Sequence, residues 1–301
     1  MIYLLLAVFF GSSIAVFLKY LRRCGVGIGE TICVNYIVAT LVGIVVNAAR
    51  YDLHINPLGE FWCWMAFVRG SFMVGALMMI AVATESYGVV MSTVASKVSF
   101  VVPVIGSWLL LGDREPLWLA VLGMLIALLL LCMDGKPMRW KGKIRMGIWH
   151  LPIVFLCYGL SNFLLRVAQN DITSRYGDDT VLIDAQFNAF ASASFLFALI
   201  CGTLLLVVRN LWKGTADSIK KTGVGWHSLW SGLSLGVVNM ACTYCMMRAL
   251  EETPTTLFYP IYNVGVVSIT AFCGWLFFRE RLTKYQVGGL LLSLLTLMSF
   301  T

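Results

Sequence analysis

The chain has 301 residues, of which 59% are hydrophobic and 12% are charged. A soluble domain averages about 45–50% apolar and about 25% charged residues, so this composition excludes an ordinary soluble protein. The net charge of +7 does not indicate nucleic-acid binding, because the Lys and Arg residues concentrate in short loops between apolar runs. We therefore expect an integral, multi-pass membrane protein whose partner is the lipid bilayer, without nucleic acid.

Apolar runs long enough to cross a bilayer as helices follow one another along the chain. The ten predicted spans cover residues 2–18, 30–48, 64–84, 89–111, 117–133, 147–168, 180–208, 228–250, 255–278 and 284–300. The first run is expected to stay as a span, because its positive residues follow it, whereas a signal peptide has them in front. The predicted fold is all-α, with five-helix halves at 1–134 and 147–301 joined by a basic linker at 135–146.

The two halves are expected to be repeats of one unit. A shift of 166–167 residues lays the charged stop at 109–117 on the one at 276–284, and lays Lys97 on Asn263. Chance similarity between two apolar sequences is the alternative, and the coincidence of charged stops at one shift argues against it. Because five spans are an odd number, the second half would be inverted in the membrane, which places a substrate site near the midplane.

Charge in the loops predicts the orientation. The loops after the first, fifth, seventh and ninth spans carry three to five Lys or Arg residues each, and the alternate loops carry fewer. Since positive loops stay in the cytoplasm, we expect both termini outside, with the chain in a bacterial-type cytoplasmic (inner) membrane.

Several short motifs are typical of one transporter superfamily. An Arg-Gly pair (69–70) opens the third span and Ala-Thr-Glu (83–85) closes it, and a Pro, apolar run and Gly follow at 103–123 and again, in part, at 279–298. The chain resembles the drug/metabolite transporter superfamily and, within it, the ten-span EamA-type transporters, although Asp113 stands where that family usually has Glu. The resemblance implies transport of metabolites, amino acids or drugs, usually outward. It also implies cytoplasmic termini, which differs from the loop charge.

Lys97 is the first candidate for a site residue. It stands about eight residues inside an apolar run, roughly 12 Å from the end and close to the membrane midplane. An ammonium there costs about 2.5–3.5 kcal/mol on insertion scales, and such groups face a polar cavity or a partner. Lys97 could anchor a carboxylate or phosphate, or it could lose its charge through desolvation. The alternatives are snorkelling and an ion pair with a carboxylate such as Glu85.

Polar and aromatic side chains in the other spans are the further candidates for substrate binding. They are Asn35, Tyr36, Ser161, Asn162, Gln186, Asn188, Asn239, Tyr244, Tyr259, Tyr262 and Asn263. Each could instead stabilise helix packing. Asp184, one turn inside the seventh span, and Lys97 are the candidates for proton coupling. Arg69 and Arg166 are expected to snorkel to the interface.

The expected function is secondary transport of a small polar metabolite, such as an amino acid or organic anion, by a monomeric exporter or exchanger. No cofactor or metal is expected, because Cys242 and Cys245 are spaced as one turn of a membrane helix and have no second Cys or His pair. A channel or receptor-like membrane protein is the alternative. An integral-membrane enzyme is a weaker one, because no H-E-x-x-H, G-x-S-x-G or phosphate-binding P-loop occurs.

Overall fold

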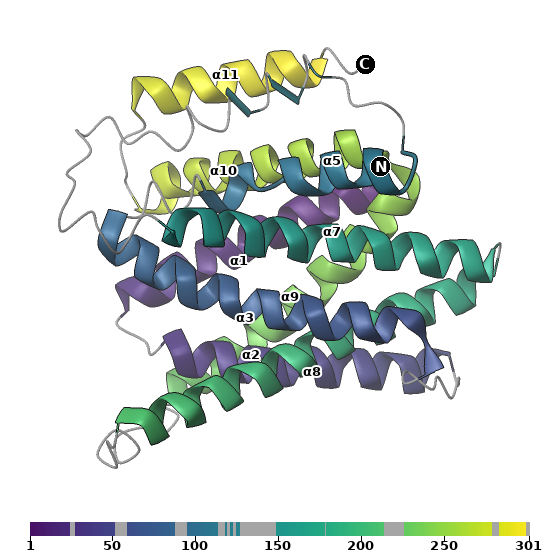
Figure 1. Ribbon diagram of the computed structural model, residues 1–301. Helices are drawn as coiled ribbons and strands as arrows, with labels where there is room; N and C mark the ends of the chain where they lie inside the picture. The colour runs from purple at the N-terminus through teal and green to yellow at the C-terminus, as the bar shows by residue number, and fades with distance from the viewer. Residues whose placement is uncertain are drawn as a thin grey trace.

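The computed structural model describes most of the chain as long helices (Figure 1). The described residues are 1–24, 28–51, 59–87, 95–113, 118, 121, 122, 125, 126, 149–177, 179–213, 226–278 and 283–298. The helices are α1 (Ile2–Arg23), α2 (Ile28–Arg50), α3 (Phe61–Tyr87), α5 (Val101–Leu110), α7 (His150–Tyr176), α8 (Thr180–Lys213), α9 (Trp226–Glu252), α10 (Thr255–Phe278) and α11 (Lys284–Met298). No strand occurs among these residues.

Six of the helices are long and apolar enough to cross a membrane, counted over the described residues. Their apolar stretches are Glu30–Arg50, Phe61–Met79, His150–Tyr176, Thr180–Leu205, Trp226–Glu252 and Thr255–Phe277. Shorter apolar helices cover Ile2–Leu18 and Ala95–Leu110. The prediction of an all-helical membrane protein is thereby confirmed. Most of the predicted fifth span, 117–133, lies outside the described residues.

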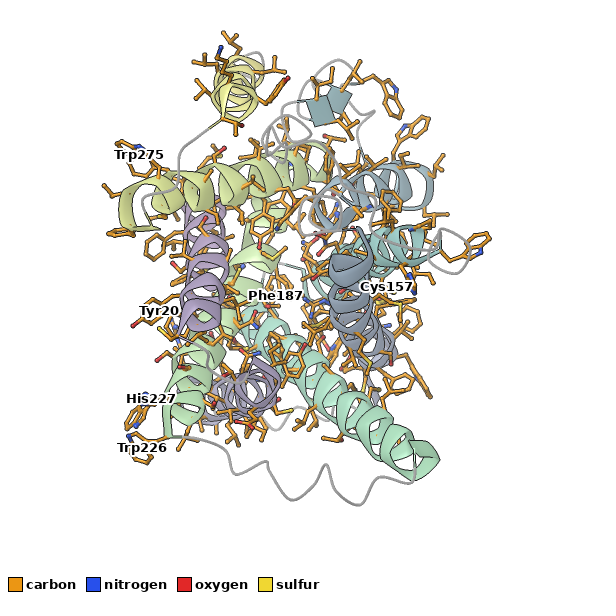
Figure 2. The ribbon with its side chains drawn as sticks, turned by 90° about the vertical axis from the view of Figure 1, so that its left-hand side faces the viewer. Tyr20, Cys157, Phe187, Trp226, His227 and Trp275 are labelled. Carbon is orange, nitrogen blue, oxygen red and sulfur yellow. The ribbon has the colours of Figure 1, made fainter. Side chains whose placement is uncertain are left out.

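The closest helix packing joins early helices to late ones. α3 packs on α7 and α8, α2 on α8 and α9, α1 on α9 and α10, and α5 on α7 and α10. α11 lies beside α10 at the edge of the assembly (Figure 1). The core between the helices is apolar: Phe187 is completely buried inside, whereas Trp226 and Trp275 project from the periphery (Figure 2). Exposed apolar side chains are what a helix surface facing lipid requires.

Two helix pairs run parallel and are held close by glycines. A Cβ added to Gly236 would lie 2.6 Å from Val38 Cβ and 2.9 Å from the Asn35 carbonyl oxygen, so α2 and α9 touch through their backbones. Close approach of this kind is the usual role of glycine between membrane helices. In both pairs the residue numbers rise together along the contact. The contacts are Gly232 with Val34, Gly236 with Val38, Gly70 with Ala198, and Gly202 with Val74.

Three other pairs run antiparallel, because residue numbers fall on one helix as they rise on the other. These contacts are Tyr3 with Tyr244 and Ala7 with Cys242 (α1 and α9), Thr40 with Ser192 and Asn47 with Ala185 (α2 and α8), and Glu60 with Tyr176 and Gly75 with Cys157 (α3 and α7). The parallel and antiparallel contacts link α1 to α7 through α9, α2, α8 and α3 in turn. Taken together, they make α1 and α7 point in opposite directions.

The helix that carries Lys97 is interrupted. Residues 95–98 form one helical turn, residues 99–100 form a turn, and α5 begins at Val101. Pro103 has no N–H to donate to the Ser99 carbonyl, which instead accepts the Val102 N–H at 3.0 Å. The predicted continuous span at 89–111 is therefore broken next to Lys97. Its first part, 89–94, lies outside the described residues.

Candidate functional site

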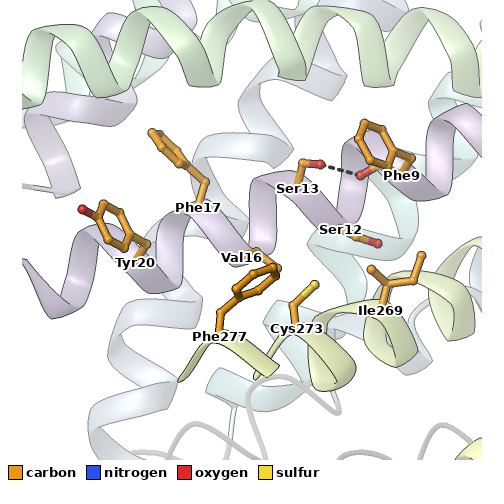
Figure 3. A pocket seen from close by; sticks show the side chains of 9 residues that line it. All are labelled: Phe9, Ser12, Ser13, Val16, Phe17, Tyr20, Ile269, Cys273 and Phe277. Carbon is orange, nitrogen blue, oxygen red and sulfur yellow. Dashed lines mark hydrogen bonds between the residues drawn. The ribbon is translucent and has the colours of Figure 1, made fainter. Parts of the chain in front are cut away.

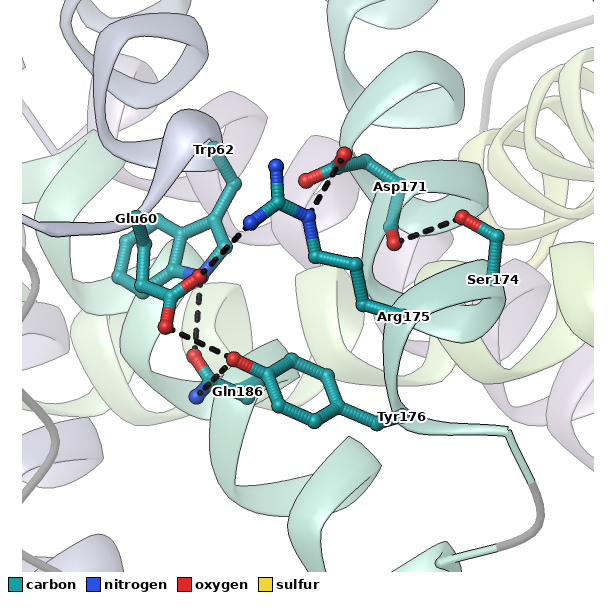
Figure 4. Close-up of polar contacts among 7 residues, drawn as sticks. All are labelled: Glu60, Trp62, Asp171, Ser174, Arg175, Tyr176 and Gln186. Atoms are coloured by element: carbon teal, nitrogen blue, oxygen red, sulfur yellow. Dashed lines mark hydrogen bonds and ion pairs between the residues drawn. The ribbon is translucent and has the colours of Figure 1, made fainter.

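One end of the helix bundle carries most of the polar pairs. This end holds Met1, lies at the right of Figure 1, and is called the N-terminal end below. The ammonium of Met1 forms an ion pair with Glu252 there. In the network of Figure 4, the Tyr176 hydroxyl donates to Glu60 at 2.7 Å, and Trp62 Nε1 donates to Gln186 Oε1 at 2.9 Å. The predicted substrate residue Gln186 also donates to Tyr176 at 3.1 Å, so its amide ties helices together.

Asp184 and Tyr244 form a second network at the same end. An Asp184 oxygen lies 2.6 Å from the Arg248 guanidinium and accepts the Tyr244 hydroxyl. The Arg248 and Asp184 side chains are only 11% and 18% exposed. Just beyond α2, burial and the Asp184 carboxylate raise the pKa of the Tyr51 hydroxyl. Asp184 was predicted as a candidate for proton coupling. It lies in a mostly buried ion pair between α8 and α9.

A hollow of about 660 Å³ opens at this end and is called the vestibule below. Its wall contains an ion pair between α7 and the segment after α5: Arg166 Nη2 lies 2.6 Å from Asp113 Oδ1, and Arg166 Nε donates to Oδ2 at 3.3 Å. Thr255 donates to the same carboxylate at 2.6 Å. The snorkelling expected of Arg166 is wrong, because it is 9% exposed and this pair holds it. The vestibule is lined by Gly112, Asp113, Arg166, Gln169, Asn170, Thr173, Ser174, Leu250, Glu251, Glu252, Thr253 and Pro254.

Tyr259 is a buried residue of α10 that lies near the vestibule wall and the interior. Its ring is fully buried, and its hydroxyl donates to the Asn162 carbonyl oxygen at 2.5 Å, which joins α10 to α7. The hydroxyl lies within electrostatic range of Arg166 and Asp113 in the vestibule wall and of Arg69 in the interior. A predicted site residue is therefore near both Arg69 and the pair of Arg166 with Asp113.

Arg69 lies in the interior, and two of its guanidinium nitrogens have no hydrogen-bond acceptor. Its side chain is 5% exposed, and its Nε and Nη1 atoms have no hydrogen-bond partner. Its Cζ atom lies 5.7 Å from the centre of the Phe190 ring. The groups that its charge acts on most strongly are the hydroxyls of Tyr259, Tyr36 and Tyr262 and the thiol of Cys242. This is a buried cation surrounded by aromatic residues.

The snorkelling expected of Arg69 is also wrong. The predicted span began at residue 64, but α3 begins at Phe61, which places Arg69 about 12 Å from the helix end. Next to it, a Cβ on Gly70 would lie 2.7 Å from the Ala198 nitrogen and the Ser194 oxygen, so α8 packs directly against this turn. The argument that singled out Lys97 applied equally to Arg69, and a span starting three residues earlier would have identified it.

The predicted candidates of α2, α9 and α10 lie in the same interior region. Asn239 Nδ2 donates to Asn35 Oδ1 at 3.2 Å between α9 and α2. Tyr262 stacks on Phe258, and its hydroxyl lies 3.7 Å from Cys242 Sγ. Each of these side chains is held by a neighbour in this closed arrangement.

The remaining candidates differ in burial. Asn263 is buried, and its Nδ2 donates to the Tyr259 carbonyl oxygen at 3.0 Å. Ser161 and Asn188 are buried, and Tyr36 packs against Phe195. Lys97 is half-buried, and its charge also acts on Cys242, so it faces the same region as Arg69. Glu85, its alternative ion-pair partner, lies at a position whose side chain is outside the described ones.

A second hollow lies between α1 and α10 and differs in character (Figure 3). Its volume is about 680 Å³, and most of its lining is apolar, including Phe9, Phe17 and Phe277. The hydroxyls of Ser12 and Ser13 donate to carbonyls of their own helix at 2.6 and 2.8 Å, so they offer little to a polar solute. This groove suits hydrocarbon.

No group of three metal-ligating side chains occurs among the residues that the structure describes.

Comparisons with known proteins agree with the predicted resemblance. Residues 180–301 match the EamA-like transporter family, within the drug/metabolite transporter superfamily, which confirms the resemblance for that segment. The chain is 23% identical over 305 aligned positions to a protein of Haemophilus influenzae described as uncharacterized, covering 97% of this chain and 94% of that one. A crystal structure of another protein matches 98% of this chain and 93% of its own with a TM-score of 0.70. At 12% identity that likeness concerns the fold alone.

Proposed function

Because residues 180–301 match the EamA-like transporter family, we propose that the chain is a secondary transporter that works by alternating access. Its cargo is a small polar metabolite, such as an amino acid or organic anion, and it acts as an exporter or exchanger. It works as a monomer without a cofactor or metal. The observation that carries this proposal is the packing of the early helices on the late ones.

The packing supports two equivalent halves, 1–134 and 147–301, joined by the linker at 135–146. If α1, α2, α3 and α5 correspond to α7, α8, α9 and α10, then each contact between halves has a counterpart. α3 on α7 corresponds to α9 on α1, α2 on α9 to α8 on α3, and α5 on α7 to α10 on α1. The contacts of α2 with α8 and of α5 with α10 correspond to themselves. A twofold relation of the halves produces this pattern directly.

The helix directions support an inverted relation. α1 and α7 run in opposite directions. α2 and α8, which also correspond, are antiparallel as well. α5 and α7 run the same way, since Gly159 lies at Val102 and Gly106 at Phe163, which supports the span predicted between them. Ten spans in two inverted halves follow. Such halves place the substrate at their interface near the midplane and rock about it.

The interior supplies the proposed substrate site. Its side chains come from helices of both halves and lie between the closed N-terminal end and the opposite end of the bundle. They are Asn35, Tyr36, Lys97, Ser161, Asn162, Asn188, Asn239, Tyr259, Tyr262 and Asn263. Gln186, Tyr244 and Asp184 belong in this proposal to the networks that close the N-terminal end. The opening of these networks would admit the cargo from that side.

The orientation proposed from loop charge is also supported by the helix ends. α1, α8 and α10 end at the side opposite Met1, and α2, α7 and α9 begin there. The four basic loops adjoin these helix ends and therefore share one face. We place this face in the cytoplasm and both termini outside. Labelling of a single cysteine introduced at position 141 by a membrane-impermeant reagent, in intact cells, would refute this orientation.

Counterflow in proteoliposomes tests the transport function. Vesicles containing the purified chain are loaded with one unlabelled metabolite at a time, from amino acids and organic anions, and uptake of the labelled form is measured. An alternating-access carrier accumulates label transiently when it is preloaded, because the loaded site returns faster than the empty one. Uptake that is linear in concentration and unaffected by preloading would indicate a channel instead. No uptake across the panel contradicts the proposal.

A further inference from the structure

We propose that the Arg69 guanidinium binds the carboxylate of the transported metabolite, and that this metabolite is an organic anion without an ammonium group. The inference rests on the proposed transport function and narrows its substrate class. It starts from one observation: a cation inside a membrane-spanning helix, 5% exposed, whose Nε and Nη1 have no acceptor. Arg69 forms no ion pair with any residue that the structure describes.

An isolated charge at this depth is unfavourable. The desolvation penalty for a buried ion in a protein is several kcal/mol even after relaxation, and it is offset only by a counter-charge with good geometry. Phe190 offers a ring face at 5.7 Å, and the titratable groups on which the Arg69 charge acts most strongly are neutral hydroxyls and a thiol. None of these groups supplies a negative charge, so a bound anion is the partner that the site lacks.

The fold does not require a cation at this position. At the shift of 166 residues that relates the two halves, Gly70 corresponds to Gly236, and both glycines seat their helix against a neighbour. Arg69 then corresponds to Leu235, which is 3% exposed. A leucine packs at the equivalent place of the second half. The arginine is therefore an addition to the shared architecture, which suits a ligand-binding group better than a packing one.

The surroundings of Arg69 select among anions. Either edge of a guanidinium pairs Nη2 with Nε or with Nη1, so a carboxylate on either edge would reach one of the unpartnered nitrogens. Two described carboxylates could serve an ammonium group here: Asp113, near Tyr259, and Asp184, on α8. Both are already paired with arginines. An ammonium group on the cargo would have no acidic partner among them.

The test uses matched pairs of hydroxy and amino acids. Lactate and alanine, and phenyllactate and phenylalanine, share a carboxylate and differ in a hydroxyl or an ammonium. The full chain in detergent is titrated with each, and the midpoint of thermal unfolding is followed by tryptophan fluorescence. At least one hydroxy acid should raise the midpoint, more than its amino acid does. In Arg69→Leu the apparent affinity should fall about 10- to 100-fold, as expected for the loss of a charged hydrogen bond.

Variants without ligand separate binding from packing. Arg69→Leu should unfold at or above the temperature of the unchanged chain, because it removes an uncompensated charge. Arg69→Met has an unbranched apolar side chain longer than that of leucine, and it controls for poor packing by leucine. Arg69→Lys keeps the charge and should retain part of the ligand shift. Arg50→Leu, an exposed arginine at the end of α2, should change neither quantity.

Several results would overturn the inference. They are a clear loss of stability without ligand in both Arg69→Leu and Arg69→Met, tighter binding of the amino acids, a ligand shift that persists in these variants, and no shift with any probe. The transport function is tested separately. Binding through Arg69 without counterflow contradicts transport alone, whereas counterflow that is unchanged in Arg69→Leu contradicts the role of Arg69 alone.

Discussion

The ion pair between Asp113 and Arg166 should stabilise the contact of α7 with the segment after α5 at the vestibule. It joins α7 to Asp113, three residues after the end of α5, with oxygens 2.6 and 3.3 Å from the guanidinium. The Asp113 and Arg166 side chains are 14% and 11% exposed. Breaking a fully buried pair costs about 3–5 kcal/mol, because one charge remains without a partner. Allowing for the partial exposure, we expect Asp113→Asn to lower the free energy of unfolding by about 2–4 kcal/mol.

A double-mutant cycle isolates this interaction. Asp113→Asn, Arg166→Gln and the double variant are unfolded by titration with denaturing detergent in mixed micelles. The double variant should lose less than the sum of the single losses, by about 1.5–3 kcal/mol, because its partner charge is also gone. Asp171→Asn is the control, since its partner Arg175 is 45% exposed and such pairs contribute about 0.3–0.5 kcal/mol. Losses that add within about 0.5 kcal/mol would refute the reasoning.

Three further changes follow from packing and hydrogen bonds and use the same titration. Gly236→Ala should lower the free energy of unfolding by about 1–3 kcal/mol through overpacking. Gly288→Ala, whose Cβ would meet nothing within 4 Å, should change it by no more than about 0.5 kcal/mol. Equal effects would contradict the close contact at Gly236. Trp62→Phe should cost about 1–3 kcal/mol, because it leaves the buried Gln186 amide oxygen unpaired. Trp64→Phe, at an exposed position, should cost much less. A reversed order would contradict the role of the hydrogen bond between Trp62 and Gln186. Tyr259→Phe should cost about 0.5–1.5 kcal/mol, and no loss would mean that its hydroxyl does not join α10 to α7.

The helices were largely predictable from the sequence, because each depends on a local property. A run of apolar residues must form its backbone hydrogen bonds internally in lipid, so its length predicts a helix wherever it occurs. The span predicted at 255–278 coincides with α10, and the one at 180–208 begins where α8 begins. The interruption next to Lys97 was missed, although Pro103 was the signal for it.

The site was only partly predictable, because polar pairing depends on which helix faces meet. Asn35 and Asn239 were both selected for their polarity, but nothing in the sequence paired them across α2 and α9. Asp184 was selected as a candidate for coupling, but nothing in the sequence paired it with Arg248 of another helix. Arg69 was assigned to the interface through an error of three residues in the start of α3.

The sequence by itself determined that this protein lies in a membrane, the order of its helices and the charge of its loops. These follow from hydrophobicity and charge, which each segment carries without reference to any other. The tertiary structure alone decided which polar groups are matched and that Arg69 is left without an acceptor. The reason is that a hydrogen bond or ion pair needs two groups within about 3–4 Å, and here the partners come from helices far apart in the chain.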